Sequence, residues 1–408
     1  MKILHTADWH LGKRLENFSR LEEQKQVLKE ICEIADNQKV DAIIIAGDLY
    51  DTFNPPAEAT DLFYKTLRTL TKNGRRPVVA IAGNHDSPDR IEAPDPLARA
   101  CGIIFAGYPH SEVPKFSTEA GLEVINTEPG FVELKLPEQE TPLRLILTPY
   151  ANEYRMKTFL GLDDEEGELR SLLEKKWADL ANKYCDNQGI NLLVTHLFMI
   201  KKGGEVPEEP DDEKPVLHVG GAQAIYTENI PPQIQYTALG HLHRFQTVDN
   251  TPSPTVYSSS PLSYSFSEAN QQKYVVIIEA EANKDVVYDK VPLQSGKKLL
   301  RKKFKNIDEA EHWLKENPDT LLELILVTDN YLTAEIRNRL ANAHDGIVTI
   351  IPELISAQEE TTSTSSIDLN LEMQELFKRY FKHKHAGQEP NEEILELFKE
   401  IQAVTSEE

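Results

Sequence analysis

Short apolar runs that end in metal-binding side chains recur five times along this chain and constrain its fold more than any other feature. The side chains at these ends are carboxylate, amide or imidazole groups: Asp8 and His10, Asp48, Asn84 and His85, His196, and His241 and His243. A short apolar run bounded by glycine and polar residues predicts a buried β-strand that leads into a loop. Each residue alone is common at a turn, but five such strand ends predict one clustered site on one side of a single sheet.

Asp8 and His10 stand two residues apart at the end of the first strand. Because residues i and i+2 of an extended chain point to the same side, we expect both side chains to face one metal ion. The alternative interpretation is that Asp8 is a turn or capping residue and His10 a surface residue. The other four strand ends favour the metal site, because they supply the further ligands that it needs.

Strands and helices alternate along the first 85 residues. Apolar residues recur at helical spacing over residues 17–38 and 58–70, and near-continuous apolar runs at 40–46 and 77–82 predict strands covered on both faces. This order is typical of a layered α/β fold whose site lies at the strand ends. Further strands are expected at 143–147, 191–194, 236–239, 255–267 and 273–281, with a helix at 161–182.

The chain has 408 residues, too many for one ordinary core, and its character changes after residue 290. We divide it into a large α/β domain (1–290), a small α+β domain (291–355), a polar linker (356–369) and two amphipathic C-terminal helices (370–408). In the small domain, strands are expected at 320–327 and 348–351, with a helix at 334–343.

The net charge of −23, from 44 basic and 67 acidic residues, argues against a protein that binds nucleic acid through its overall electric field. Such binding would need local positive charge, bound divalent metals or a basic partner. No run of about eighteen apolar residues occurs, so no membrane-spanning helix is expected. The first apolar stretch is too short for a signal peptide, and three scattered cysteines suit a reducing compartment, so we expect a cytoplasmic protein.

Imidazole and carboxylate ligands without cysteine favour manganese, zinc or iron. The number of candidate ligands exceeds the four of one tetrahedral ion and fits two ions about 3.5–4 Å apart that share a carboxylate. Asp48 is the natural bridge, because it stands alone at the end of a central strand. Among these metals we expect Mn²⁺, which suits mixed oxygen and nitrogen ligands with open positions.

The five blocks, in this order, resemble the pattern of the calcineurin-like metallophosphoesterase family. They are Asp8-Trp9-His10, Gly47-Asp48-Leu49-Tyr50-Asp51, Gly83-Asn84-His85-Asp86, His196, and Gly240-His241-Leu242-His243. The resemblance implies a four-layer α/β/β/α sandwich. It also implies hydrolysis of a phosphoester by a hydroxide that two metal ions generate.

By this resemblance, the candidate site residues divide into two ligand sets and one catalytic group. Asp8, His10 and His243 would hold one metal, Asn84, His196 and His241 the other, with Asp48 bridging them. His85 would be a catalytic residue and not a ligand, placed to protonate the leaving oxygen or stabilise developing charge. Asp51 and Asp86 are candidates for carboxylates that orient these histidines, or are solvated or capping residues.

Within that superfamily, several segments resemble the bacterial SbcD family, the counterparts of the eukaryotic Mre-type DNA repair nucleases. These segments are ILHTADWHLGKRL at the N-terminus, AGNHDSPDRIEA at 82–93, ALGHLHRFQ at 238–246 and YSSSPLSYSFSE at 257–268. The resemblance implies a Mn²⁺-dependent double-strand exonuclease and single-strand or hairpin endonuclease, acting in DNA end processing, repair, recombination and replication. The partner would be an SbcC-type ATPase with coiled coils, in a heterotetramer that contains a homodimer of this chain.

The same resemblance implies roles for the remaining parts. Residues 291–355 would cap the DNA groove, and 370–408 would dock on the coiled-coil base of the ATPase. Arg14, Asn17 and Arg90 lie near the metal loops and are candidates for contacts with DNA phosphates. The basic run at 297–305 would face DNA or be a solvated strand edge, where lysine commonly blocks pairing.

Two other functions share the same ligands. A phosphodiesterase or phosphatase that acts on small-molecule phosphoesters would need every metal ligand of a nuclease, so residues 1–270 do not exclude it. A non-catalytic scaffold with the same fold is disfavoured by the complete ligand set, and absence of bound metal would be its sign.

Overall fold

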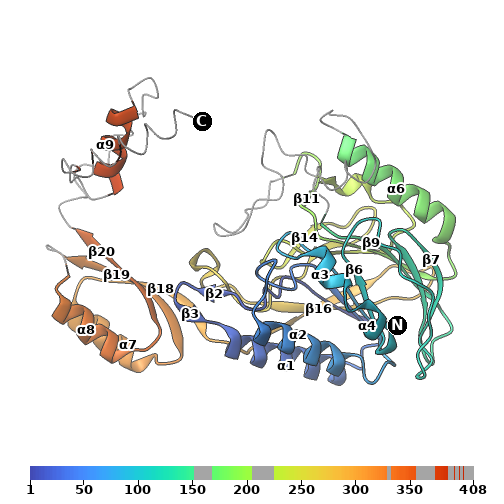
Figure 1. Ribbon diagram of the computed structural model, residues 1–408, viewed down its shortest axis with the longest axis horizontal. Coiled ribbons are helices and arrows are strands. Elements are labelled where there is room, and N and C mark those ends of the chain that lie inside the picture. Colours follow the sequence, from blue (N-terminus) through green and yellow to red (C-terminus); the bar gives the residue numbers. More distant parts are fainter. Residues whose placement is uncertain are drawn as a thin grey trace. The chain divides into compact units, whose positions relative to one another are not determined.

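The computed structural model describes residues 1–150, 168–204, 225–328, 332–354 and 373–384, with single residues near the C-terminus (Figure 1). The chain divides into two compact units, one formed by Met1–Arg301 with Asp319–Leu322 and the other by Lys302–Pro318 with Glu323–Glu408. Among the described helices, none combines the length and hydropathy that a membrane-spanning segment needs.

The first sheet of the larger unit has six strands in the order β17-β16-β1-β4-β5-β6. Strands β1, β4, β5 and β6 are parallel, whereas β16 and β17 add to the β1 edge in antiparallel fashion. The strands span Lys2–Thr6 (β1), Ala42–Ala46 (β4), Val78–Ile81 (β5), Ile103–Ala106 (β6), Tyr274–Glu279 (β16) and Val287–Pro292 (β17).

The second sheet has seven strands in the order β14-β15-β13-β10-β9-β8-β7. Its centre is parallel, from β9 through β10 and β13 to β15, and the outer strands pair antiparallel. The strands span Glu123–Glu128 (β7), Phe131–Lys135 (β8), Leu143–Thr148 (β9), Ile190–Thr195 (β10), Tyr236–Leu239 (β13), Gln246–Asp249 (β14) and Thr255–Tyr257 (β15).

The two sheets pack face to face, and helices cover the outer face of each (Figure 1). Strand β4 shows why its sequence is apolar throughout: Ile44 enters the core between the sheets, whereas Ile43 and Ile45 pack with α1 (Leu21–Asn37) and α2 (Ala57–Leu70). On the other side, α6 (Glu168–Tyr184) buries an apolar stripe that includes Trp177 against the second sheet. The predicted four-layer α/β/β/α sandwich is confirmed.

Shorter elements connect these layers. They are β2 (Arg14–Leu15), β3 (Phe18–Ser19), α3 (Pro88–Glu92), α4 (Asp95–Ala100), β11 (Met199–Ile200), β12 (Ile225–Tyr226) and two 3₁₀ turns, η1 (Thr227–Asn229) and η2 (Phe266–Glu268).

Two structural expectations from the sequence are wrong. The site strands belong to two sheets instead of one. The strand expected at 255–267 ends at Tyr257, because Ser259 takes a positive φ of 79° and Pro261 follows within a loop. The helix expected at 161–182 begins outside the described residues, and its described part is α6.

The part of the chain after residue 297 contains a three-stranded sheet in the order β18-β19-β20. Its elements are β18 (Lys298–Phe304), α7 (Ile307–Glu316), β19 (Thr320–Thr328), α8 (Ala334–Ala343), β20 (Ile347–Leu354) and α9 (Met373–Lys384). Most of the basic run lies on β18, an edge strand, where Lys303 pairs with Glu353 at 2.6 Å and Lys302 lies over the Trp313 ring. These contacts favour the strand-edge interpretation of the run. The linker at 356–369 lies outside the described residues.

Candidate metal centre

The five polar blocks meet at one edge of the sandwich, at the carboxyl ends of β1, β4 and β5 in the first sheet and of β10 and β13 in the second. Hydrogen bonds join the two sheets there, among them those from His241 N to Asp8 Oδ1 (2.8 Å), His196 Nδ1 to Ala46 O (2.8 Å) and His5 Nε2 to Leu239 O (3.1 Å). The seven predicted ligands are all buried, and only Asn84 retains any exposed surface, at 8%. The fold therefore brings the whole predicted set together.

Glycine residues let the loops of the two sheets approach this closely. A β-carbon on Gly240 would lie 1.9 Å from the Ala46 carbonyl oxygen, and one on Gly83 would lie 2.1 Å from Asp48 Oδ1. Any larger residue would push the strand ends apart. The glycines of these blocks are therefore packing requirements of the site itself.

The backbone at four predicted ligands is in the left-handed region, with φ of 55° at Asp8, 43° at His10, 48° at Asp48 and 107° at His241. Strand β1 ends at Thr6, so Asp8 and His10 are not in an extended chain, and the expected i, i+2 geometry is wrong. Non-glycine residues persist in this region only where surrounding contacts hold them, and they cluster at functional sites. Here the loops of β1 and β4 hydrogen bond to each other, from Asp8 N to Gly47 O and from His10 N to Asp48 O, both at 3.0 Å.

His10, His243 and Asp48 form one side of the cluster. The Nε2 atoms of His10 and His243 are 3.0 Å apart, and His10 Nε2 is 3.5 Å from Asp48 Oδ2. Because His243 Nδ1 donates to Glu268 Oε1 at 3.1 Å, the Nε2 atom of neutral His243 carries a lone pair. Two nitrogen ligands at about 2.0–2.1 Å from one ion and at right angles would be about 3 Å apart, so this pair fits a shared metal ion.

His196, Asn84 and Asp48 form the other side. His196 Nδ1 donates to a carbonyl, and its Nε2 faces Asn84 Oδ1 at 2.8 Å and Asp48 Oδ2 at 3.3 Å. Burial lowers the pKa of His196, but the Asp48 carboxylate outweighs it and raises this pKa to about 9. A cation among these acceptors would replace that proton. The ring of His241 lies beside that of His196, with centroids 5.6 Å apart.

Two carboxylate oxygens at the centre of the cluster indicate whether these residues fit a metal ion. Asp8 Oδ2 and Asp48 Oδ2 are buried, and neither accepts a hydrogen bond from the residues that the structure describes. Burial raises the pKa of Asp8 to about 6, whereas the His196 imidazole overcomes burial and holds the pKa of Asp48 well below its usual range. A buried anionic oxygen without a donor is costly unless a cation balances it. The donor set therefore fits divalent metal ions.

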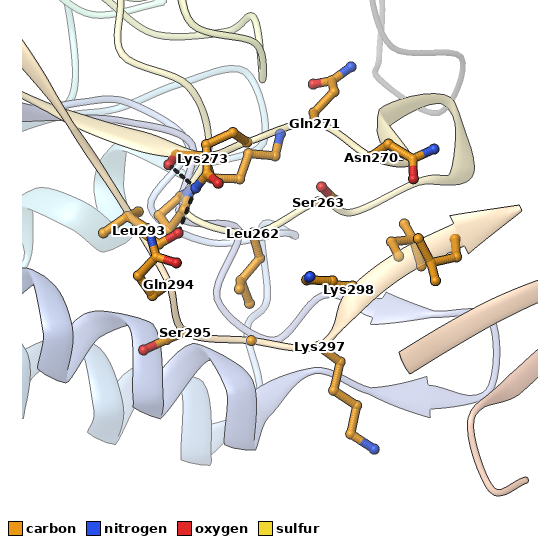
Figure 2. A pocket seen from close by; sticks show the side chains of 15 residues that line it. Leu262, Ser263, Asn270, Gln271, Lys273, Leu293, Gln294, Ser295, Lys297 and Lys298 are labelled. Atoms are coloured by element: carbon orange, nitrogen blue, oxygen red, sulfur yellow. Dashed lines mark hydrogen bonds between the residues drawn. The ribbon is translucent and has the colours of Figure 1, made fainter. Parts of the chain in front are cut away.

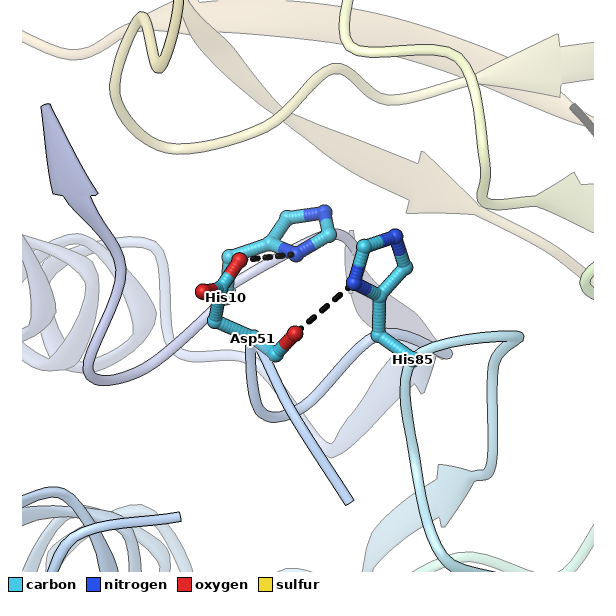
Figure 3. A group of neighbouring side chains, drawn as sticks. All are labelled: His10, Asp51 and His85. Atoms are coloured by element: carbon cyan, nitrogen blue, oxygen red, sulfur yellow. Dashed lines mark hydrogen bonds and ion pairs between the residues drawn. The ribbon is translucent and has the colours of Figure 1, made fainter. Parts of the chain in front are cut away.

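His85 lies beside this cluster, with its ring centroid 4.8 Å from that of His10 (Figure 3). Its backbone N donates to Asp48 Oδ1 at 2.9 Å, and its Nδ1 donates to Asp51 O at 2.8 Å. The second bond fixes the tautomer, so Nε2 of the neutral ring carries the lone pair. The hydrogen bond of Nδ1 thus sets the orientation of the ring.

Asp86 and Asp51 occupy different positions. The Asp86 carboxylate accepts hydrogen bonds from the N–H groups of Gly83 (2.8 Å), Leu49 (3.0 Å) and Tyr50 (2.9 Å), which ties the β4 loop to the β5 loop. Asp51 Oδ1 lies 3.7 Å from His10 Nδ1 and 3.3 Å from Lys13 Nζ. Asp86 therefore holds the backbone of the two loops together. Asp51 lies close to the charged side chain of Lys13 and to the ring of His10.

The predicted DNA-contacting residues are not buried in the cluster. Arg14 and Asn17 come together on the β2–β3 ribbon, where Arg14 Nη2 donates to Asn17 O at 2.5 Å. Arg90, on α3, donates to Asn54 Oδ1 at 3.0 Å. Both arginines are exposed.

Sequence reasoning missed Glu268 and Lys273. Glu268 is 1% exposed and contacts His243, and Lys273 Nζ bonds to its other carboxylate oxygen. Burial raises the pKa of Glu268, but Lys273 and His243 lower it more, so it stays well below the usual range. The segment that contains Glu268, YSSSPLSYSFSE, stands out only by its resemblance, and nothing in the local spacing connects residue 268 to residue 243.

A separate cavity of about 340 Å³ has Lys273 in its lining (Figure 2). Its described lining consists of serine, amide, lysine and apolar residues, among them Asn270, Gln271 and Lys298. The described lining includes no carboxylate or histidine, so this cavity lacks the donors of a metal site.

Comparison with known proteins agrees with this geometry. The model of the calcineurin-like phosphoesterase family matches residues 1–245. A protein from Bacillus subtilis (strain 168), named as the SbcD component of the nuclease SbcCD, is 36% identical over 416 residues, covering 100% of this chain and 99% of the relative. A protein of the same name from Staphylococcus epidermidis (strain ATCC 12228 / FDA PCI 1200) is 30% identical over 299 residues, covering 73% of this chain and 71% of the relative. The chain therefore belongs to the calcineurin-like phosphoesterase family and, within it, to the SbcD family of SbcCD nuclease components.

Proposed function

We propose that this chain is a Mn²⁺-dependent DNA nuclease that works with an SbcC-type ATPase. The observation that carries the proposal is the pair of buried carboxylate oxygens of Asp8 and Asp48, which face imidazole nitrogens at the meeting point of two sheets. The full-length similarity to proteins named as components of a nuclease supports DNA as the substrate. The activities we propose are double-strand exonuclease and single-strand or hairpin endonuclease, in DNA end processing, repair and recombination.

Each predicted ligand has a place in this proposal. One ion would be held by Asp8, His10 and His243, the other by Asn84, His196 and His241, with Asp48 between them. The bridging role of Asp48 is supported by its Oδ2 atom, which lies 3.5 Å from His10 Nε2 and 3.3 Å from His196 Nε2. When bound, the two ions would neutralise charge on the phosphate and supply a hydroxide. The mixed nitrogen and oxygen donors, without thiolate, favour Mn²⁺.

His85 would move the proton that the reaction requires. With Nδ1 held by Asp51 O, the protonated imidazolium form of His85 would deliver the proton on Nε2 to the leaving oxygen and return to the neutral ring. The Asp86 carboxylate holds the loop of His85 against the loop of Asp48 through hydrogen bonds to backbone N–H groups. The Asp51 carboxylate lies near His10 Nδ1 and pairs with the charge of Lys13. These contacts hold the catalytic imidazole at a fixed distance from the ligands.

DNA would contact the surface around the site. Arg14, Asn17 and Arg90 are placed on exposed elements where they could hold backbone phosphates. Because the chain carries a net charge of −23, we assign the remaining positive charge to the metals and the ATPase partner. Residues 291–355 would cap the DNA groove. We also propose a homodimer within a heterotetramer, located in the cytoplasm.

The C-terminal helices would dock on the coiled-coil base of the ATPase. Of this segment the structure describes α9, which carries Phe377 on the same face as Phe381. The ring of Phe398 stacks on that of Phe377 with centroids 4.1 Å apart. The rings of Phe377 and Phe381 thus lie on one face of α9, and Phe398 adds a third ring to this aromatic cluster.

Digestion of end-labelled duplex DNA, with and without the partner ATPase and ATP, tests the proposed function. We expect cleavage that requires Mn²⁺ and increases with the partner, and slower turnover of bis-p-nitrophenyl phosphate. If the protein cleaves the small ester but does not cleave DNA, it is instead a small-molecule phosphodiesterase.

A truncation tests the docking role of the C-terminal segment. A chain that ends at residue 369 should keep its metals but no longer copurify with the ATPase, and retained copurification would disprove the docking role.

A further inference from the structure

We propose that Glu268 is a positioning residue for the metal ligand His243, and that Lys273 holds Glu268 in place. The inference rests on the proposed metal centre and adds to it a carboxylate outside the five blocks. Glu268 ends the 3₁₀ turn η2, is 1% exposed, and accepts hydrogen bonds through Oε1 from His243 Nδ1 and from Tyr264 N, both at 3.1 Å. Its position is therefore fixed by the backbone as well as by the histidine.

Lys273 connects the carboxylate to the backbone of the ligand itself. Its side chain is 6% exposed, and its Nζ donates to Glu268 Oε2, to His243 O at 2.7 Å and to Ser260 Oγ at 3.0 Å. The ammonium group of Lys273 thus hydrogen bonds both to the main chain of His243 and to the Glu268 carboxylate that orients the His243 ring. Three acceptors satisfy the three N–H bonds of a lysine, so the network is complete.

The hydrogen bond from His243 Nδ1 to Glu268 fixes the tautomer of His243, so that Nε2 can serve as a metal ligand. With the proton on Nδ1, the Nε2 lone pair points toward His10 Nε2, 3.0 Å away. A carboxylate that accepts the other ring proton fixes the tautomer and raises the basicity of a metal-bound histidine. At His10 the corresponding carboxylate is more distant, since Asp51 Oδ1 is 3.7 Å from the Nδ1 of that ring.

The cost of burying this network also indicates a role beyond packing. A buried ion pair is often no more stabilising than apolar side chains of similar volume. The described contacts of Glu268 and Lys273 with the ligand cluster are those with His243. Glu268 should therefore affect the metal that His243 binds, and leave the metal of Asn84, His196 and His241 unchanged.

Calorimetric titration of metal-free protein with Mn²⁺ tests this assignment. We expect Glu268→Gln to weaken one of the two Mn²⁺ sites by about 10–100-fold and to leave the other unchanged. The double variant Glu268→Gln/Lys273→Met removes the unpaired buried charge, so it should fold while keeping the same defect. Both titrations are run beside thermal unfolding of the metal-free protein.

Glu23→Gln is the matched control, because it also breaks a buried ion pair. Glu23 Oε1 is 2.8 Å from Arg20 Nε, and the two residues are 8% and 1% exposed, but neither contacts a predicted ligand side chain in the described hydrogen bonds and ion pairs. We expect this variant to unfold at a lower temperature and to bind Mn²⁺ like the wild type. Wild-type affinity at both sites of Glu268→Gln, or an equal loss in Glu23→Gln, would overturn the inference. Failure of the wild-type protein itself to bind two Mn²⁺ would instead overturn the proposed metal centre.

Discussion

Replacement of His85 with alanine is expected to lower the rate of DNA cleavage by about 10²–10⁴-fold, the range of a general acid or base, with two Mn²⁺ still bound. The alanine removes Nε2 and also the hydrogen bond from Nδ1 to Asp51 O, but it leaves the backbone N–H that donates to Asp48 Oδ1. Cleavage of end-labelled duplex under saturating Mn²⁺ gives the rate, and elemental analysis gives the metal content.

The leaving group separates two roles of His85. If Nε2 protonates the leaving oxygen, His85→Ala should slow a p-nitrophenyl ester far less than DNA, because p-nitrophenolate leaves without a proton. An equal loss on both substrates would point to stabilisation of charge on the phosphate. His110→Ala is the matched control, since the ring of His110 stacks on that of Tyr108 and none of its described contacts is with a predicted site residue. A His85→Ala rate within about threefold of wild type, far short of what a general acid contributes, would remove His85 from the mechanism.

Substitution of Asp48 by asparagine should remove both metal ions. The side chain keeps its shape and can still accept the His85 N–H through Oδ1, but it loses the charge on the oxygen between His10 and His196. We expect fewer than one Mn²⁺ per chain after dialysis and no measurable cleavage, since both ions would share this ligand.

Asn84→Ala provides the comparison for Asp48→Asn. Asn84 Oδ1 lies on the His196 side of the cluster, so this variant should lose one ion and retain the other. Metal content measured after identical dialysis distinguishes the two variants. Two ions retained by Asp48→Asn would show that the carboxylate does not bridge.

Most of the fold and the whole ligand cluster could be predicted from the sequence, because the information is local. The run at residues 40–46 is apolar at every position except Asp41, and the structure places β4 there with both faces covered. The predicted helix at 58–70 and strand at 236–239 match α2 and β13 almost residue for residue. Asp, Asn and His residues that follow parallel strands then lie close together, because the carboxyl ends of parallel strands meet at the same edge of a sheet.

What the sequence could not predict depends on contacts distant along the chain. The hydrophobic pattern alone placed the site strands in one sheet, because it does not specify which strands pair; the two β layers were implied only by the family resemblance. The left-handed backbone of Asp8 and His10 is imposed by the loop at Gly47 and Asp48, so spacing alone gave the wrong local geometry. Glu268 reaches His243 from 25 residues away through a turn that no periodicity marks.

The pairing of β1 with β16 has a consequence for the order of assembly. Strand β1 lies between β4 and β16, and the terminal amino group of Met1 donates to Ala280 O, 279 residues along the chain. During synthesis, one edge of β1 stays without its partner until residue 280 has left the ribosome. Closure of such long-range contacts is slow compared with the formation of local helices. Since Glu268 and Lys273 lie shortly before β16, a nascent chain can carry all seven predicted ligands and still lack the carboxylate that accepts a hydrogen bond from His243, which would delay a competent metal centre until the central sheet is complete.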